Sequence, residues 1–210
     1  MKMKSQPVAL GFRVKSGRAI AVLVSGSKSL PQVLDHRVVQ LSDPARPETI
    51  QPYHARMGKL EENRATIKRR TGIVERAAQK SVTDLLKEYR SKGYKIQTAG
   101  LVVGSLIDPA IIGNPHVRAH ALEGRLFRTV LEKALRRQKL PSFVILERDI
   151  YPRGEAALGK TEGELKNLLA DIGRPLEGPW RADEKVAALA AWTTFGRTPV
   201  KRSQMKKTSR

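Results

Sequence analysis

The sequence contains no cysteine among its 210 residues. Disulfide bonds and thiolate-bound metals are therefore excluded, and a reducing compartment is permitted. Aromatic residues are also scarce, at 5% of the chain. Basic and aromatic side chains do not alternate around either tryptophan, Trp180 or Trp192. We therefore expect both tryptophans to pack in the core or in a lid rather than to stack on nucleic-acid bases.

Long apolar runs are missing as well. The longest early run, from Ala19 to Val24, is far too short to span a bilayer. The basic N-terminus is not followed by the apolar centre of a signal peptide, because Arg13 and Lys15 interrupt the apolar residues there. These absences predict a cytoplasmic protein that has no membrane partner.

Acidic residues are few relative to basic ones. The chain has 20 Asp and Glu against 40 Lys and Arg, which gives a formal net charge of +20. Such an excess favours a polyanionic partner, because neutralised phosphates release counterions and strengthen binding. The charge therefore predicts binding to nucleic acid, without separating DNA from RNA. The alternative is a noncatalytic scaffold or interaction protein whose charge serves solubility.

Hydrophobic patterns predict five strands. The expected strands lie at residues 8–14, 19–24, 33–41, 99–104 and 142–148. Short turns separate the first three strands, which predicts an antiparallel meander. A helix separates the last two strands, which predicts that they run parallel through a right-handed crossover.

Helical spacing fills the intervals between these strands and the region after them. Residues 47–92 read as a helical segment, or an arm in its basic early part, and residues 116–139 read as a second helix. A later helix begins at Thr161, which forms a capping box with Glu164, and the last helix begins near Asp183.

This order predicts one α/β domain of the ribonuclease-H-like type over residues 1–195. We expect a five-stranded mixed sheet, with three antiparallel strands followed by two parallel crossovers and with helices on both faces. Residues 196–210 carry basic side chains and no acidic ones, which predicts a disordered tail.

Two acidic residues stand at the ends of late elements. Glu147 follows the apolar run of the fifth strand, and Asp183 opens the last helix. Carboxylates at such positions can converge on Mg²⁺ or Mn²⁺ and activate water for phosphodiester hydrolysis. Glu184 or Asp108 could supply a further catalytic carboxylate. The alternative is that Glu147 pairs with an arginine and Asp183 caps its helix.

Four short motifs follow one another in a recognisable order. They read Leu10-Gly11-Phe12-Arg13, Val102-Val103-Gly104, Leu146-Glu147-Arg148 and Ala182-Asp183-Glu184-Lys185-Val186-Ala187. Together they resemble the RuvC-type resolvases, and most closely the YqgF branch of the Holliday-junction-resolvase-like nucleases. The resemblance covers about residues 8–24 and 99–195. It implies a ribonuclease-H-like fold and a metal-dependent nuclease whose carboxylates would fall on positions 13, 147 and 183.

Position 13 departs from that family, because it carries Arg13 in place of an aspartate. A guanidinium group cannot ligate a cation and repels one. The resemblance and this departure together predict a nucleic-acid-binding protein with a degraded metal site. An active Mg²⁺- or Mn²⁺-dependent nuclease is the alternative. A homodimer would suit a symmetric junction.

Eight basic residues are candidates for contacts with phosphate, although such side chains often form a solvated surface. They are Arg13, Lys15, Lys68, Arg69, Arg70, Arg136, Arg137 and Arg148.

Three further residues share one face of the helix at 116–139, because His116, His120 and Glu123 stand at positions i, i+4 and i+7. They could bind zinc, and the alternative is a solvated helix face.

Overall fold

The computed structural model describes residues 7–27 and 29–195, and its centre is one sheet with the strand order β3-β2-β1-β4-β5. The strands are β1 (Pro7–Lys15), β2 (Arg18–Gly26), β3 (Pro31–Gln40), β4 (Lys95–Val103) and β5 (Ser142–Leu146). Strand β1 pairs antiparallel with β2 and parallel with β4. The β2–β3 pair is antiparallel and the β4–β5 pair is parallel. The predicted five-stranded mixed sheet is therefore confirmed.

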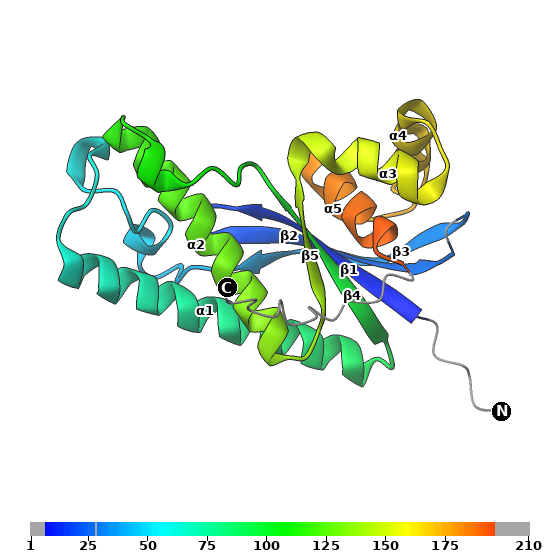
Figure 1. Cartoon of the computed structure of the whole chain (residues 1–210). Coiled ribbons are helices and arrows are strands. Elements are labelled where there is room, and N and C mark those ends of the chain that lie inside the picture. Colours follow the sequence, from blue (N-terminus) through cyan, green and yellow to red (C-terminus); the bar gives the residue numbers. More distant parts are fainter. Residues whose placement is uncertain (1–6, 28, 196–210) are drawn as a thin grey trace, which may run out of the picture.

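Helices cover both faces of this sheet (Figure 1). The two long helices, α1 (Arg64–Ser91) and α2 (Pro115–Arg137), lie on one face. The shorter helices α3 (Ile150–Leu158), α4 (Glu162–Asp171) and α5 (Ala182–Thr193) lie on the other. The capping box that was predicted at Thr161 is present at the start of α4. The predicted basic tail lies outside the described residues, and the domain boundaries stay a prediction.

Strand alternation places the side chains of β1 in two separate cores. Leu10 and Phe12 pack with α1 and α2, whereas Ala9 packs with α3, α4 and α5. Since successive side chains of a strand point to opposite faces, Arg13 and Lys15 belong to the α5 face together with Ala9. The side chain at position 13 therefore lies on the face of the sheet that α5 covers.

Helix α5 lies unusually close to the sheet because glycines leave room for its backbone. A Cβ atom added at Gly11 would lie 1.8 Å from the carbonyl oxygen of Ala187, and one added at Gly100 would lie 2.5 Å from that of Ala190. Asp183 precedes Ala187 by four residues, so it shares the face of α5 that meets β1. This close packing brings Asp183 to the end of β1.

We expect the substitution Gly11→Ala to destabilise the protein by about 3 kcal/mol, because the new methyl group would overlap the backbone of α5 and push the helix away. The melting temperature should fall by roughly 6–12 °C in a thermal unfolding experiment. Gly163→Ala is the control, since a Cβ atom there meets nothing within 4 Å. Equal melting temperatures for Gly11→Ala and the wild type would contradict the close packing.

A loop of residues 41–63 connects β3 to α1 and contains the short 3₁₀ helices η1 (Pro47–Thr49) and η2 (Arg56–Gly58). Arg70 of α1 holds this loop, because its guanidinium donates to the carbonyl oxygens of His54 at 2.9 Å and Pro52 at 3.3 Å. The same guanidinium lies 3.4 Å from the carboxylate of Glu61. Within the described residues, no helix combines the length and the apolar character needed to cross a membrane.

Candidate functional site

The C-terminal ends of β1, β4 and β5 meet at one edge of the sheet, because these three strands run parallel. In the strand register Arg13 lies opposite Val102, and Val103 lies opposite Leu146. Glu147 follows directly in the 3₁₀ helix η4 (Glu147–Asp149). The fold thus brings positions 13 and 147 together, and α5 adds Asp183 from above the sheet.

Arg13 is the centre of this cluster. Its side chain is only 7% exposed, and its Nη2 donates a hydrogen bond to Oε2 of Glu147 at 2.5 Å. Its Nε lies 3.6 Å from Oδ1 of Asp183, and its Nη1 donates to the carbonyl oxygen of Val14 at 3.3 Å. Lys15 also reaches Asp183, with its Nζ 3.0 Å from the same Oδ1. Two cations and two carboxylates therefore neutralise one another here.

These contacts do not fit a divalent cation between Glu147 and Asp183. Mg²⁺ and Mn²⁺ need several oxygen ligands, whereas this cluster supplies two carboxylates that already bind Arg13 and Lys15. The strand position that would complete the ligand set carries a positive charge, which would repel the ion. The metal-binding role of Glu147 and Asp183 stays a prediction that these ion pairs do not favour.

The alternative predicted for the two carboxylates is half right. Glu147 does pair with an arginine. Asp183 does not cap its helix, because α5 begins at Ala182 and its N-cap residue is Arg181. Asp183 is instead the second residue of the first turn, where its carboxylate is directed to Lys15 and Arg13 by the side-chain contacts above.

The two further carboxylate candidates have other partners. Glu184 is buried, and its Oε2 accepts a hydrogen bond from the backbone N–H of Arg181 at 2.8 Å, which closes the first turn of α5. Asp108 accepts from the backbone N–H of Ala110 at 3.1 Å and lies 3.5 Å from Nη1 of Arg125. Within residues 7–27 and 29–195, neither joins Glu147 and Asp183 in a cluster of three or more metal-binding side chains.

A groove of about 640 Å³ lies beside Arg13, between the end of β1, the loop after β4 and helix α2. Its charged lining consists of Arg13, Lys15, Arg125 and Arg128 and one carboxylate, that of Asp108. Sequence reasoning missed Arg125 and Arg128. Arg125 and Arg128 stand three residues apart, so the sequence indicates that they share one side of α2. Only the packing of α2 shows that this side faces the groove.

The three basic residues near the start of α1, Lys68, Arg69 and Arg70, have different surroundings. Arg70 is tied to the loop of residues 41–63, as described above. Arg69 lies 3.8 Å from Glu48, and Lys68 is exposed. All three are on the α1–α2 side of the sheet and none lines the groove beside Arg13.

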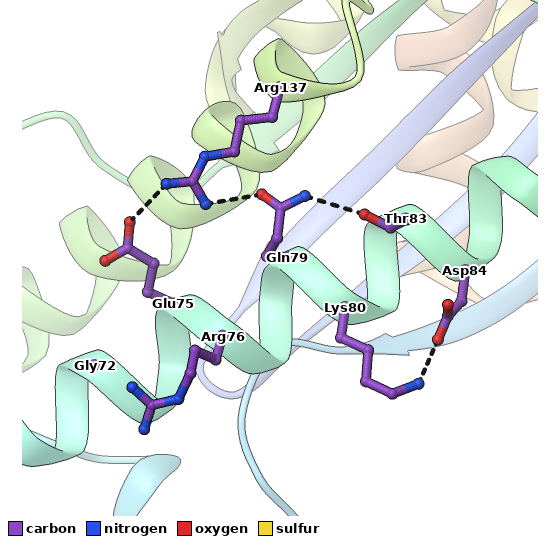
Figure 2. Close-up of a pocket in the computed structure, with 8 residues that line it drawn as sticks. All are labelled: Gly72, Glu75, Arg76, Gln79, Lys80, Thr83, Asp84 and Arg137. Carbon is purple, nitrogen blue, oxygen red and sulfur yellow. Dashed lines mark hydrogen bonds and ion pairs between the residues drawn. The ribbon is translucent and has the colours of Figure 1, made fainter.

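The remaining basic candidates lie apart from that groove. Arg137 reaches from the end of α2 to α1, where it donates to Gln79 at 3.0 Å and lies 3.7 Å from Glu75 (Figure 2). Arg136 is exposed. Arg148 extends into solvent with Asp149 at 3.7 Å. Their contacts with phosphate stay predictions, and none of the three lines the groove beside Arg13.

The predicted trio on α2 is brought together, and a fourth residue joins it. His116 and His120 lie with His54, which comes from the loop of residues 41–63. Glu123 is fully buried and its Oε1 accepts a hydrogen bond from Nδ1 of His54 at 2.7 Å. Burial raises the pKa of Glu123, and the contact with His54 opposes that rise. No spacing rule could link His54 to α2, because the two are far apart in the chain.

No protein-family profile matches the sequence, and no curated protein matches it. Among solved structures, RuvC of Thermus thermophilus in complex with a Holliday junction substrate is similar, with a TM-score of 0.54 and 13% identity over 90% of this chain and 92% of that chain. A second Thermus thermophilus RuvC structure gives a TM-score of 0.52 and 14% identity over 90% and 93%. The chain therefore has the ribonuclease-H-like fold of the RuvC resolvases.

Proposed function

We propose that this protein binds structured nucleic acid and does not cleave it by a metal-dependent route. The observation that carries the proposal is the buried Arg13 guanidinium, which contacts both Glu147 and Asp183. In a metal-dependent nuclease those carboxylates would hold the ion that activates water. Here a fixed positive charge takes that place, so the fold is retained while the means of generating a nucleophile is lost.

The groove beside Arg13 supports the binding half of the proposal. Arg125 and Arg128 project from α2 into it, and Lys15 lies at its β1 side. Asp108 is the one acidic residue in its lining. Arginine forks suit the oxygens of a phosphate group, and the net charge of +20 adds long-range attraction. Four-way junction DNA is the first ligand to test, since the similar Thermus thermophilus RuvC was solved with a Holliday junction substrate.

We expect the double variant Arg125→Gln/Arg128→Gln to bind four-way junction DNA at least about 10-fold more weakly than the wild type, because two phosphate contacts and their counterion release are lost. Fluorescence anisotropy with labelled junction, duplex and single-stranded DNA and RNA would measure this. The matched control is Arg153→Gln/Arg174→Gln, which removes the same charge from two exposed arginines near α3 and α4. An equal loss in the control would contradict a role for the groove.

The same substrates incubated with Mg²⁺ or Mn²⁺ test the other half of the proposal. We expect little cleavage by the wild type. Robust cleavage that disappears in Asp183→Asn would overturn the noncatalytic proposal and favour an active nuclease. Failure to bind any of these nucleic acids would instead favour a scaffold or interaction protein. The pairing of two copies on a symmetric junction stays a prediction.

A further inference from the structure

A second cluster of polar side chains lies outside the Arg13 cluster, where the loop before α1 meets α2. His54 comes from this loop, and His116 and His120 come from the first turns of α2. Each of the three offers a ring nitrogen, and these nitrogens lie within 4.8 Å of one another. The chain has 4 histidines, so three of them meet at this single point.

The loop that carries His54 is held in place before any ligand arrives. Its two sides are joined by backbone hydrogen bonds, from Ala55 N to Lys59 O at 2.7 Å and from Glu61 N to Tyr53 O at 2.8 Å. Arg70 binds the carbonyl oxygen of His54 from α1 at 2.9 Å. These contacts fix the backbone of the loop, and the hydrogen bond between Nδ1 of His54 and Glu123 at 2.7 Å positions the ring.

Hydrogen bonds define which ring nitrogens remain for a ligand. A carboxylate and a carbonyl oxygen can only accept, so Nδ1 of His54 donates to Glu123 at 2.7 Å and Nδ1 of His116 donates to the backbone oxygen of Gly58 at 2.9 Å. In the neutral rings this leaves a lone pair on Nε2 of His54 and of His116. The second oxygen of Glu123 lies 3.5 Å from Nδ1 of His120, which favours Nε2 as the ligand of that ring too.

The distance between two of the three nitrogens suits one small ion. Nε2 of His116 and Nε2 of His120 are 3.2 Å apart. Two nitrogens that bind one tetrahedral Zn²⁺ at about 2.0–2.1 Å lie about 3.3–3.4 Å apart. The His54 ring lies 4.5 Å from that of His120 and 5.2 Å from that of His116, measured between ring centroids. The ring nitrogen that His54 offers lies within 4.8 Å of the other two, so a rotation of its ring that brings this nitrogen closer would complete the site.

Nε2 of His54 gives the strongest indication of a ligand. The His54 side chain is 7% exposed, and its Nε2 is buried without a hydrogen-bond partner. A buried polar atom without a partner costs free energy, and fully orphaned groups are rare in folded proteins. A solvated helix face would explain His116 and His120, which are exposed, but it leaves this buried nitrogen unexplained.

We propose that His54, His116 and His120 bind a Zn²⁺ ion through their Nε2 atoms. Glu123 is not a ligand in this proposal but supports one. A carboxylate that accepts a hydrogen bond from the other ring nitrogen of a histidine fixes the tautomer of that histidine and makes the ring a stronger ligand. The backbone oxygen of Gly58 does the same for His116. Three histidine ligands leave a fourth position for water, and the ion ties the loop of residues 41–63 to α2.

Zinc titration of the purified full-length protein, prepared without a histidine tag and stripped with EDTA, tests the proposal. We expect calorimetry to show one Zn²⁺ bound per chain with a submicromolar dissociation constant and thermal unfolding to show a higher melting temperature with zinc. Co²⁺ should give the intense visible absorption of a tetrahedral site. His116→Asn and His120→Asn should each weaken zinc binding by at least about 100-fold, and Glu123→Gln by about 10–100-fold.

His36→Asn is the matched control, because His36 lies elsewhere and its Nε2 contacts the backbone oxygen of Glu177 at 2.9 Å. It should bind zinc as the wild type does. The exposed His116 and His120 are changed, rather than His54, because substitutions at exposed positions disturb the fold least. Circular dichroism of each metal-free variant shows whether the fold is retained. Absence of stoichiometric binding, or binding that survives both His116→Asn and His120→Asn, would overturn the proposal.

Discussion

Replacing Arg13 with aspartate should create a site for Mg²⁺ or Mn²⁺ at the end of β1. The substitution removes the guanidinium that contacts Glu147 and Asp183 and places a third carboxylate at the end of β1. Three carboxylates at one point attract Mg²⁺ or Mn²⁺ and supply the oxygen ligands that these ions prefer. Isothermal calorimetry with Mn²⁺ should therefore detect binding to Arg13→Asp, and Asp183→Asn in the same background should abolish that binding.

The same variant should be less stable than the wild type when no metal is present. Breaking a buried ion pair costs about 3–5 kcal/mol, and Glu147 and Asp183 are 47% and 37% exposed, so solvent reduces this cost to about 2 kcal/mol. Metal at ten times its dissociation constant should restore about 1.4 kcal/mol, which raises the melting temperature by roughly 3–6 °C. The same concentration of Mn²⁺ should not raise the melting temperature of the wild type in this way.

Arg13→Met is the control for this experiment, because it removes the positive charge without adding an oxygen ligand. If Arg13→Met gained as much Mn²⁺ affinity as Arg13→Asp, charge removal alone would account for the effect. If neither variant gained affinity, Arg13 would not occupy a ligand position. Zinc bound at the histidine cluster would complicate the titration, so Mn²⁺ binding should be measured in the His120→Asn background as well.

Affinity for nucleic acid should fall steeply with salt. If Arg125, Arg128 and two further cations each neutralise a phosphate, the slope of log affinity against log salt is about −3.6, and affinity falls roughly 100-fold between about 50 and 200 mM salt. Anisotropy titrations of junction DNA at several salt concentrations would give the slope. A flat dependence would contradict phosphate-dominated binding.

The salt slopes of two variants show whether the phosphate contacts lie in the groove. Arg125→Gln/Arg128→Gln should reduce the slope by about 1.8, since two phosphate contacts are lost. Arg153→Gln/Arg174→Gln should leave the slope close to that of the wild type. A control slope as low as that of the groove variant would indicate that charge acts over the whole protein rather than through the groove.

Much of the fold could be predicted from the sequence because its signals are local. Apolar runs and short turns define β1 and β2, a less regular alternation marks β3, and the helix between β4 and β5 predicts a parallel crossover. The capping box of Thr161 and Glu164 involves residues only three apart. The charge excess and the arginine at position 13 are also properties of the sequence alone.

The partners of the charged residues were decided only by the tertiary structure. Arg13 and Glu147 are 134 residues apart, and the parallel register of β1, β4 and β5 makes them neighbours. Arg70 looked like a candidate for phosphate, yet its contacts hold the loop before α1. His54 joins His116 only because that loop packs against α2. Contacts between distant segments depend on how whole elements pack, and no local spacing in the chain encodes that.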